Sequence, residues 1–161
     1  TLVAPVSRLN IMIGRTLGGA TVATMQGVIV FAISLLAGFR PDNWLLLPLV
    51  ILIMILVAVL FTALGTMIAS RLDDMQGFQL IVNFLVMPLF FLSGALFPLQ
   101  GLPKAILTVA KFDPLAYGID AFRALLINTS HFGLATDVLV LSLVTIIFLT
   151  AGSYSFSKIQ V

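Results

Sequence analysis

The chain has 161 residues, of which 61% are apolar and only 9% are charged, and its formal net charge is +2. Because a soluble domain carries about 25% charged residues, this composition excludes a soluble globular enzyme, and its hydrophobicity excludes an intrinsically disordered chain. The remaining class is an integral membrane protein. The basic residues lie singly along the chain, which argues against nucleic-acid binding. The absence of cysteine excludes a disulfide framework.

Four long uncharged runs predict four transmembrane helices. The hydrocarbon core of a bilayer is about 30 Å thick, and about 20 helical residues cross it. The runs are rich in Leu, Ile, Val and Phe, which favour insertion. The predicted spans cover residues 16–39, 45–70, 77–97 and 138–157. Because their number is even, both ends of the chain are expected on the same side of the membrane.

Short polar segments separate the first three spans and make them antiparallel neighbours. Residues 40–43 form a predicted turn, with Trp44 beside it at a membrane interface. Residues 71–74 form a second turn, in which Asp74 is a candidate N-cap for the third span. Asp73 and Asp74 could also hold a metal ion as a carboxylate pair, but helix capping is the favoured interpretation.

The stretch from 98 to 137 is too apolar for a solvated loop, yet its longest uncharged run, 124–136, is too short to cross a bilayer. Its pattern predicts two short interfacial helices, at 103–112 and 114–127. Asp113 and Pro114 are suited to the N-cap and first position of the second helix. The expected buried stripe of this helix consists of Leu115, Ile119, Phe122 and Leu126. The predicted fold is therefore an all-α membrane protein forming one transmembrane domain over 1–161.

Small and polar residues mark two helix faces. Gly19, Ala23 and Gly27 form a small-residue face that allows close helix packing, within one chain or between subunits. Gln76, Gln79 and Asn83 recur at helical spacing in the third span, followed by Pro88, which is expected to kink the helix. Since unsatisfied amides are costly in lipid, this stripe should face protein or a wet cavity. The interpretations are a translocation path or dimer face, or a contact within the chain.

Catalytic and metal-binding patterns are absent from the sequence. It lacks a phosphate-binding P-loop, and a lone histidine, His131, cannot build a histidine metal cluster. Ser93 with His131 would fit an intramembrane serine protease only if the two side chains were hydrogen-bonded. Asp120 and Arg123 are three residues apart on a predicted helix and can pair. Such a pair would be structural or would contact substrate. We therefore expect no catalytic, cofactor-binding or metal-binding residues.

Three segments carry a family resemblance. LVAPVSR stands at 2–8, and MPLFFLSGALFP at 87–98 is followed by Leu102 and Pro103. DPLAYGIDAFR at 113–123 contains the pattern P-L-x-Y-x-x-D-x-x-R, which is met at Pro114, Leu115, Tyr117, Asp120 and Arg123. Over essentially its whole length, the chain resembles permease subunits of type-2 ABC exporters, in the subgroup of drug-resistance and nodulation-factor exporters.

The resemblance implies a topology. Such permeases have six spans, of which this chain would hold the last four and the end of a cytoplasmic segment. Both ends of the chain would be cytoplasmic, in a bacterial or archaeal cytoplasmic membrane. The helices at 103–112 and 114–127 would be the external re-entrant pair. Pro5, Ser7 and Arg8 would lie where the permease contacts its ATPase subunit.

The resemblance also implies partners and an activity. Two permease copies would pair, and each would bind a separate ATPase subunit that carries ATP and magnesium. The cargo would be an amphipathic drug, lipid or lipid-linked glycan. Two alternatives remain open at this point: a membrane anchor that transports nothing, and a secondary transporter. The lack of ionisable residues in the middle of the uncharged runs argues against the latter.

Overall fold

The computed structural model describes residues 8–72, 74–97, 99, 101 and 103–157. These residues form helices joined by turns and loops, and no strand occurs among them. The elements are α1 (Arg8–Leu36), the 3₁₀ helix η1 (Trp44–Leu46), α2 (Leu47–Ala69), α3 (Met75–Leu92), α4 (Lys104–Ala110), α5 (Pro114–Ile127) and α6 (Leu134–Ser157). The predicted all-α fold is confirmed.

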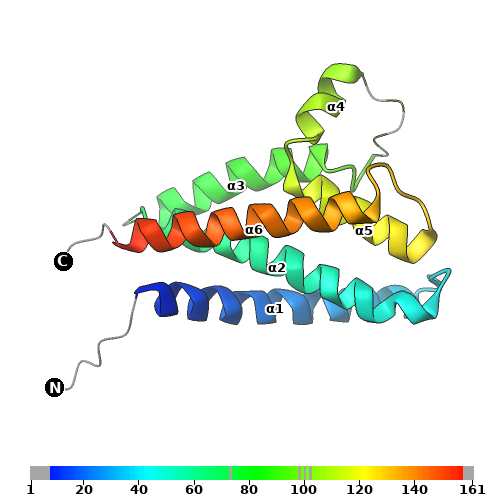
Figure 1. Cartoon of the computed structure of the whole chain (residues 1–161), viewed down its shortest axis with the longest axis horizontal. Coiled ribbons are helices and arrows are strands. Elements are labelled where there is room, and N and C mark those ends of the chain that lie inside the picture. Colours follow the sequence, from blue (N-terminus) through cyan, green and yellow to red (C-terminus); the bar gives the residue numbers. More distant parts are fainter. Residues whose placement is uncertain (1–7, 73, 98, 100, 102, 158–161) are drawn as a thin grey trace.

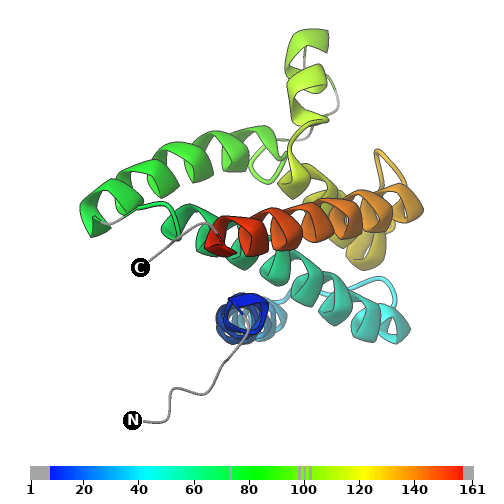
Figure 2. The ribbon, with the colours of Figure 1, turned by 60° about the vertical axis from the view of Figure 1, so that its left-hand side comes forward.

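Four segments are long and apolar enough to cross a membrane, as predicted. They are Asn10–Leu36, Trp44–Ala69, Met75–Leu92 and Leu134–Gly152. The start of α1 and the end of α6 lie at one end of the bundle, together with the turn between α2 and α3 (Figure 1). We call the opposite end, which carries the segment 37–43 and the loop 128–133, the loop end. The short helix α4 projects sideways from the bundle (Figures 1 and 2).

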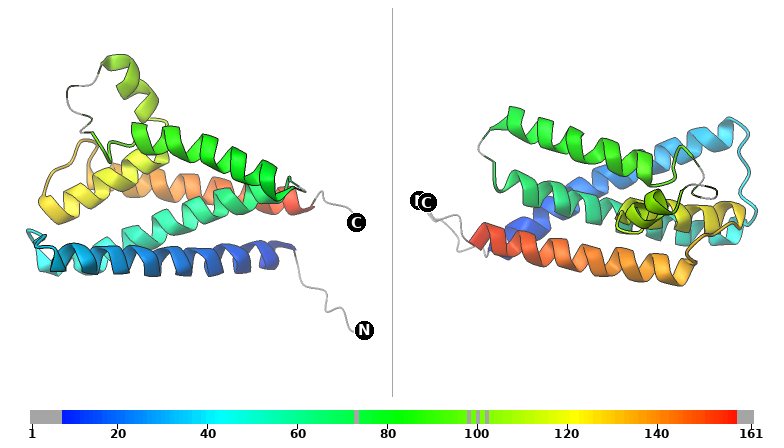
Figure 3. Two further views of the ribbon diagram at one scale, coloured as in Figure 1. Left: turned by 180° about the vertical axis from the view of Figure 1, so that it is seen from behind. Right: turned by 90° about the horizontal axis from the view of Figure 1, so that it is seen from above.

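The central helix is α2, which contacts α1, α6, α5 and, more lightly, α3 (Figure 3). On one stretch of α2, Val50 and Ile53 pack against Ala121 and Leu125 of α5. Further along, Leu60 forms a second buried cluster with Tyr117 of α5 and Leu141 of α6. The helix α5 is therefore wedged between α2 and α6 and forms part of the core.

This wedge corrects the predicted orientation of α5. The expected stripe of Leu115, Ile119, Phe122 and Leu126 is only half-buried. The buried residues instead include the three small ones Ala116, Gly118 and Ala121, together with Tyr117, Asp120 and Leu125. A Cβ at Gly118 would lie 2.9 Å from a methyl group of Val57, so α5 approaches α2 too closely for a larger residue there. Close packing thus places α5 with its small face inward.

The helix ends follow from local chemistry. Asp74 caps α3 by accepting hydrogen bonds from the backbone N–H groups of Gln76 and Gly77, and Asp113 caps α5 by accepting from Leu115. Both capping predictions are confirmed. Beyond the end of α1 lies Gly38, and beyond the end of α3 lies Gly94, with φ of 103° and 80° respectively. Both values belong to the left-handed region that favours glycine.

Three span boundaries differ from the predicted ones by about four residues or more. α1 begins at Arg8 rather than 16, because Arg15 is exposed near the end of the helix, where its long side chain can reach water. α3 ends at Leu92 rather than 97, before the left-handed turn at Gly94. α6 begins at Leu134 rather than 138, and its first turn takes Asp137 into the protein interior.

The helix α3 stands apart from the rest of the bundle. No residue of α3 is buried, and the exposed fractions of Leu80 and Phe84 are 71% and 83%. In Figure 3 it lies on the opposite side of α2 from α6. Its sequence is as apolar as that of a buried helix, so in the membrane this surface is left for lipid or for other protein.

Candidate functional site at the loop end

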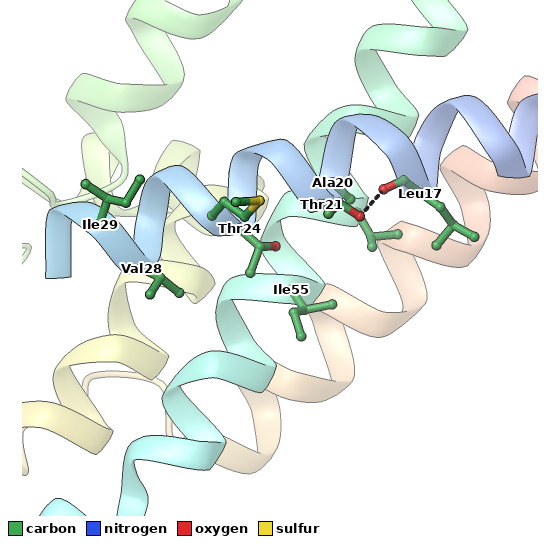
Figure 4. A pocket seen from close by; sticks show the side chains of 9 residues that line it. Leu17, Ala20, Thr21, Thr24, Val28, Ile29 and Ile55 are labelled. Atoms are coloured by element: carbon green, nitrogen blue, oxygen red, sulfur yellow. Dashed lines mark hydrogen bonds between the residues drawn. The ribbon is translucent and has the colours of Figure 1, made fainter. Parts of the chain in front are cut away.

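Two hollows lie along α1, and both are almost wholly apolar. One, of about 420 Å³, lies between α1 and α2 (Figure 4). Its few polar groups include the Thr21 hydroxyl, which donates to the Leu17 carbonyl at 2.8 Å within the same helix. The other, of about 680 Å³, lies between α1, α2 and α5, and Ala23 and Gly27 line it. Neither offers a charged group, so each suits an apolar chain.

The small-residue face of α1 serves packing within the chain at Gly19. A Cβ at this position would lie 2.5 Å from the Thr62 methyl group of α2. Gly27 has more room, because the nearest atom to its Cβ position is the Met54 sulfur at 3.6 Å. This face was predicted to allow close packing within one chain or between subunits. At Gly19 it packs closely against α2 of the same chain.

Charged and polar side chains converge in a third hollow, of about 320 Å³, at the loop end. We call it the polar pocket. α5 contributes Asp120 and Arg123, the loop after α5 contributes Thr129, Ser130 and His131, and Ser93 lies at the end of α3. The pocket therefore brings together residues of the 113–123 motif with the end of MPLFFLSGALFP.

Each polar residue of the 113–123 motif ties α5 to another element. The Tyr117 hydroxyl donates to the Lys111 carbonyl at 2.8 Å, which holds the turn between α4 and α5. The Tyr117 ring lies 4.8 Å from that of Phe132 in the loop before α6. Pro114 occupies the first turn of α5, where its missing N–H costs nothing. Together with the Asp113 cap, these contacts fix where α5 begins.

Asp120 ties α5 to the loop that leads into α6. Its carboxylate is buried and accepts hydrogen bonds from the Ser130 hydroxyl and from the backbone N–H groups of His131 and Phe132, at 2.8–2.9 Å. A carboxylate that accepts several hydrogen bonds can remain charged in the interior. Asp120 is therefore the anchor of the loop 128–133.

Arg123 ties α5 to the end of α3. Its guanidinium donates to the Gly94 carbonyl in the left-handed turn after α3. The expected ion pair between Asp120 and Arg123 is not formed, because each side chain has its partners elsewhere in the chain. Arg123, Asp120 and Tyr117 together act as a clasp that joins α3, α4 and α6 to α5.

Asp113 lies outside the membrane-spanning segments, at the start of α5. One oxygen accepts from the Leu115 N–H at 2.8 Å, while the other is buried and has no hydrogen-bond partner in the residues that the structure describes. Burial raises the pKa of Asp113 to about 6, and the backbone hydrogen bonds oppose this rise only in part.

The predicted alternatives of a serine protease site and a carboxylate metal site are not formed by the described residues. Ser93 is buried, and its hydroxyl donates to the Phe90 carbonyl and accepts from the Ala95 N–H, so it is not bonded to His131. The protease interpretation therefore has no geometric support. Asp73 lies outside the described residues, and no group of potential metal ligands occurs among those that are described. Pro5 and Ser7 also lie outside the described residues.

The polar stripe of α3 does not contact the rest of the described chain. Gln79 and Asn83 are exposed and bond to each other, Nε2 to Oδ1, at 3.3 Å along the helix. Pro88 lies within α3, which continues to Leu92. Among the described residues, Gln79 and Asn83 have no hydrogen bond to another helix.

Sequence reasoning missed Asp137. Its side chain is completely buried in the first turn of α6, and neither carboxylate oxygen has a hydrogen-bond partner within the described part of the chain. Asp137 directly precedes the last uncharged run, a position that is typical of the end of a loop. Its closeness to that run is the sequence feature that indicates a place inside the helix.

A family model described as ABC-2 type transporter matches residues 1–127, which is most of the chain. The chain belongs to the ABC-2 type transporter family. The match includes the clasp on α5, and it confirms the resemblance of the three sequence segments. No solved structure matches the chain significantly.

Several curated relatives are similar to this ABC-2 chain. Nodulation protein J of Rhizobium meliloti (strain 1021) is 27% identical over 145 residues, which are 89% of this chain and 55% of the relative. Nodulation protein J of Rhizobium leguminosarum bv. viciae is 29% identical over 114 residues, 71% and 43% of the two chains. The inner membrane transport permease YadH of Escherichia coli (strain K12) is 33% identical over 126 residues, 76% and 47%. The chain thus spans about half the length of these relatives.

Proposed function

We propose that the chain is the membrane-spanning part of an export permease, which moves an amphipathic substrate across the cytoplasmic membrane. The cargo class is a drug, a lipid or a lipid-linked glycan. The observation that carries the proposal is the ABC-2 family match over residues 1–127, on a chain with four helices able to span a membrane. The name of YadH, an inner membrane transport permease, supports the same membrane and the same kind of activity.

The energy would come from a separate ATPase subunit that binds ATP and magnesium. We expect its contact near Pro5, Ser7 and Arg8, at the end of the bundle opposite the loop end. α1 begins at Arg8 and packs on α2 and α6. A movement of the ATPase subunit at the start of α1 would therefore be transmitted to these helices. ATP binding would shift the permease between two arrangements that open to different sides.

Two permease copies would form the path, and α3 is the helix of this chain that is best suited to line it. Its Gln79 and Asn83 form a short polar strip, and no residue of α3 is buried. Exposed amides on a membrane helix are best satisfied by protein or water. The strip would therefore face the path or the second copy, near Pro88.

Co-purification and turnover test this function. The full-length protein would be expressed with a candidate ATPase subunit, reconstituted in lipid vesicles, and assayed for ATP hydrolysis with candidate amphipathic substrates. We expect a stable complex whose hydrolysis rises with the substrate that is exported. Binding of the ATPase without substrate stimulation or transport would identify a membrane anchor, and substrate movement driven by an ion gradient without the ATPase would identify a secondary transporter.

A further inference from the structure

The polar pocket at the loop end holds hydrogen-bond donors that the described chain does not use. Arg123 donates one N–H to the Gly94 carbonyl, and no other described group accepts a hydrogen bond from its guanidinium. The Thr129 hydroxyl and the His131 ring have no hydrogen-bond partner among the described residues. All three groups line the same hollow of about 320 Å³.

The carboxylate and the two serine hydroxyls of the pocket, in contrast, are already engaged in hydrogen bonds. Asp120 is the pocket's carboxylate, and it accepts from one hydroxyl and two backbone N–H groups. The Ser130 hydroxyl donates to Asp120 and accepts from the Gly133 N–H, and the Ser93 hydroxyl is similarly engaged. The groups left over are a guanidinium, which can only donate, and a hydroxyl and an imidazole, which can each donate. Together they suit a ligand with negatively charged oxygens.

We propose that the polar pocket binds a phosphate group through Arg123, Thr129 and His131. A guanidinium matches two phosphate oxygens through parallel N–H groups. The Thr129 hydroxyl and the His131 ring come from the loop after α5, so they can reach further oxygens from another side. A phosphate offers more oxygens than a carboxylate, and it therefore suits donors from two elements. The proposal concerns binding and does not depend on the transport proposed above.

The position of the pocket suits the headgroup level of a membrane. It lies at the loop end, where Trp44 begins η1 and is half-exposed. Tryptophan concentrates at the membrane interface, at the level of the headgroups. The phosphate would accordingly belong to a lipid headgroup, or it would be a soluble phosphate at the membrane surface. The two sources share one chemistry and are separated by the probe.

Binding to the purified full-length protein tests the proposal. Native mass spectrometry would compare phosphatidic acid with diacylglycerol of the same acyl chains, and calorimetry would titrate inorganic phosphate. We expect phosphatidic acid to be retained and diacylglycerol to be lost. Inorganic phosphate binding alone would support the same site with a soluble source. Failure of both phosphate probes to bind would overturn the proposal.

Two variants place the binding in this pocket. Arg123→Gln removes the charge and shortens the side chain, and should weaken binding by about tenfold or more, as expected for a hydrogen bond to a charged group. Thr129→Leu removes no side-chain hydrogen bond within the described chain and fills the hollow, so it should block binding while the melting temperature is kept. The matched control is Lys104→Gln, an exposed cation of α4 outside the pocket.

The pattern across these variants decides the outcome. The proposal requires loss of binding in Arg123→Gln and Thr129→Leu and wild-type binding in Lys104→Gln. Equal weakening in all three would indicate non-specific attraction to positive charge and would overturn it. Wild-type binding in a folded Thr129→Leu variant would overturn it as well, even if Arg123→Gln failed to fold.

Discussion

Two buried aspartates near the loop end, Asp120 and Asp137, differ in how their carboxylates are satisfied. Asp120 accepts from three donors, whereas neither oxygen of Asp137 has a hydrogen-bond partner among the described residues. Burial of an unpaired charge is costly, while replacement of a buried ionic group by an apolar one of similar size is often stabilising. The two residues should therefore respond in opposite ways to the same substitution.

We predict that Asp137→Leu raises the free energy of unfolding by about 1–3 kcal/mol. Asp120→Leu should lower it by about 3 kcal/mol or more, because three donors lose their acceptor at about 1–3 kcal/mol each. Thermal unfolding of both full-length variants in detergent, followed by tryptophan fluorescence, gives the comparison. A less stable Asp137→Leu variant would show that this carboxylate has a partner beyond the described residues.

Asp113 gives a prediction with a defined pH window. Its pKa rises from 3.8 to about 6 on folding, so the folded state binds a proton more tightly than the unfolded state. Its contribution is most favourable below about pH 4 and is lost as the pH rises through about 6. Asp113→Asn keeps the N-cap and cannot ionise. The stability of the wild type relative to this variant should therefore fall between pH 4 and pH 6.

Melting temperatures of both proteins across this window test the prediction. Above pH 6 the difference between them should become constant. A constant difference throughout, or one that favours the wild type increasingly as the pH rises, would contradict the assignment of the shift to burial of this carboxyl.

For single residues, local spacing in the sequence predicted the helix N-caps correctly but not the hydrogen-bond partners of Asp120 and Arg123. Asp74 and Asp113 bond to N–H groups within three residues, so the sequence alone contains the geometry. Asp120 bonds to residues ten to twelve positions away, and Arg123 to one 29 positions away. The three-residue spacing of Asp120 and Arg123 suggested a mutual pair, because it carried no information on the loop and turn that the fold brings to them.

At the scale of the element, the contact between α1 and α2 is sensitive to one glycine and not to its neighbour. A Cβ at Gly19 would lie 2.5 Å from Thr62, whereas a Cβ at Gly18 meets no atom within 4 Å. We predict that Gly19→Val lowers the free energy of unfolding by about 1–3 kcal/mol through overpacking. Gly18→Val is the matched control, with the same change in helix propensity but no clash.

Chemical or thermal unfolding of the two full-length variants measures the difference between them. Thr62→Ala should recover part of the loss in Gly19→Val, because it removes the methyl group that the new side chain meets. Equal stability of Gly19→Val and Gly18→Val would mean that α1 and α2 are not held this closely.

The four long elements could be predicted because the bilayer sets their length and composition. The ends of these helices could not be predicted where a charged residue lies inside the helix. α1 begins before Arg15, outside the uncharged run, and α6 includes the buried Asp137. The face of α5 was also misjudged. Size of side chain suggested that Leu115 and Ile119 would be buried, but close contact with α2 selects the small residues Gly118 and Ala121.

At the scale of the whole molecule, α3 is the long helix that packs most lightly on the others. The chain spans about half of its curated relatives, and α3 has no buried residue. A membrane helix can be apolar on every side and face lipid, so the sequence could not show that α3 packs so lightly. The polar strip of Gln79 and Asn83 is the feature that sets one side of α3 apart from a lipid-facing surface.

The proposed orientation predicts which end of the bundle is reached from outside the cell. The loop end should face outward, and the turn between α2 and α3 should face the cytoplasm. Because the chain has no cysteine, single cysteines can report on each end once any others in the full-length protein are replaced. Lys104→Cys places an exposed thiol near the loop end, and Met75→Cys places one at the opposite end, where Met75 is 82% exposed.

A membrane-impermeant maleimide applied to intact cells should label Lys104→Cys, and it should label Met75→Cys only after the membrane is permeabilised. The cysteine-free protein is the control for background labelling. The physical reason is that Met75 begins a helix long enough to cross the hydrocarbon core and Lys104 follows the end of that helix, so one reagent cannot reach both from one side. The reverse pattern would place the start of α1 and the end of α6 outside, and would remove Arg8 from reach of a cytoplasmic ATPase.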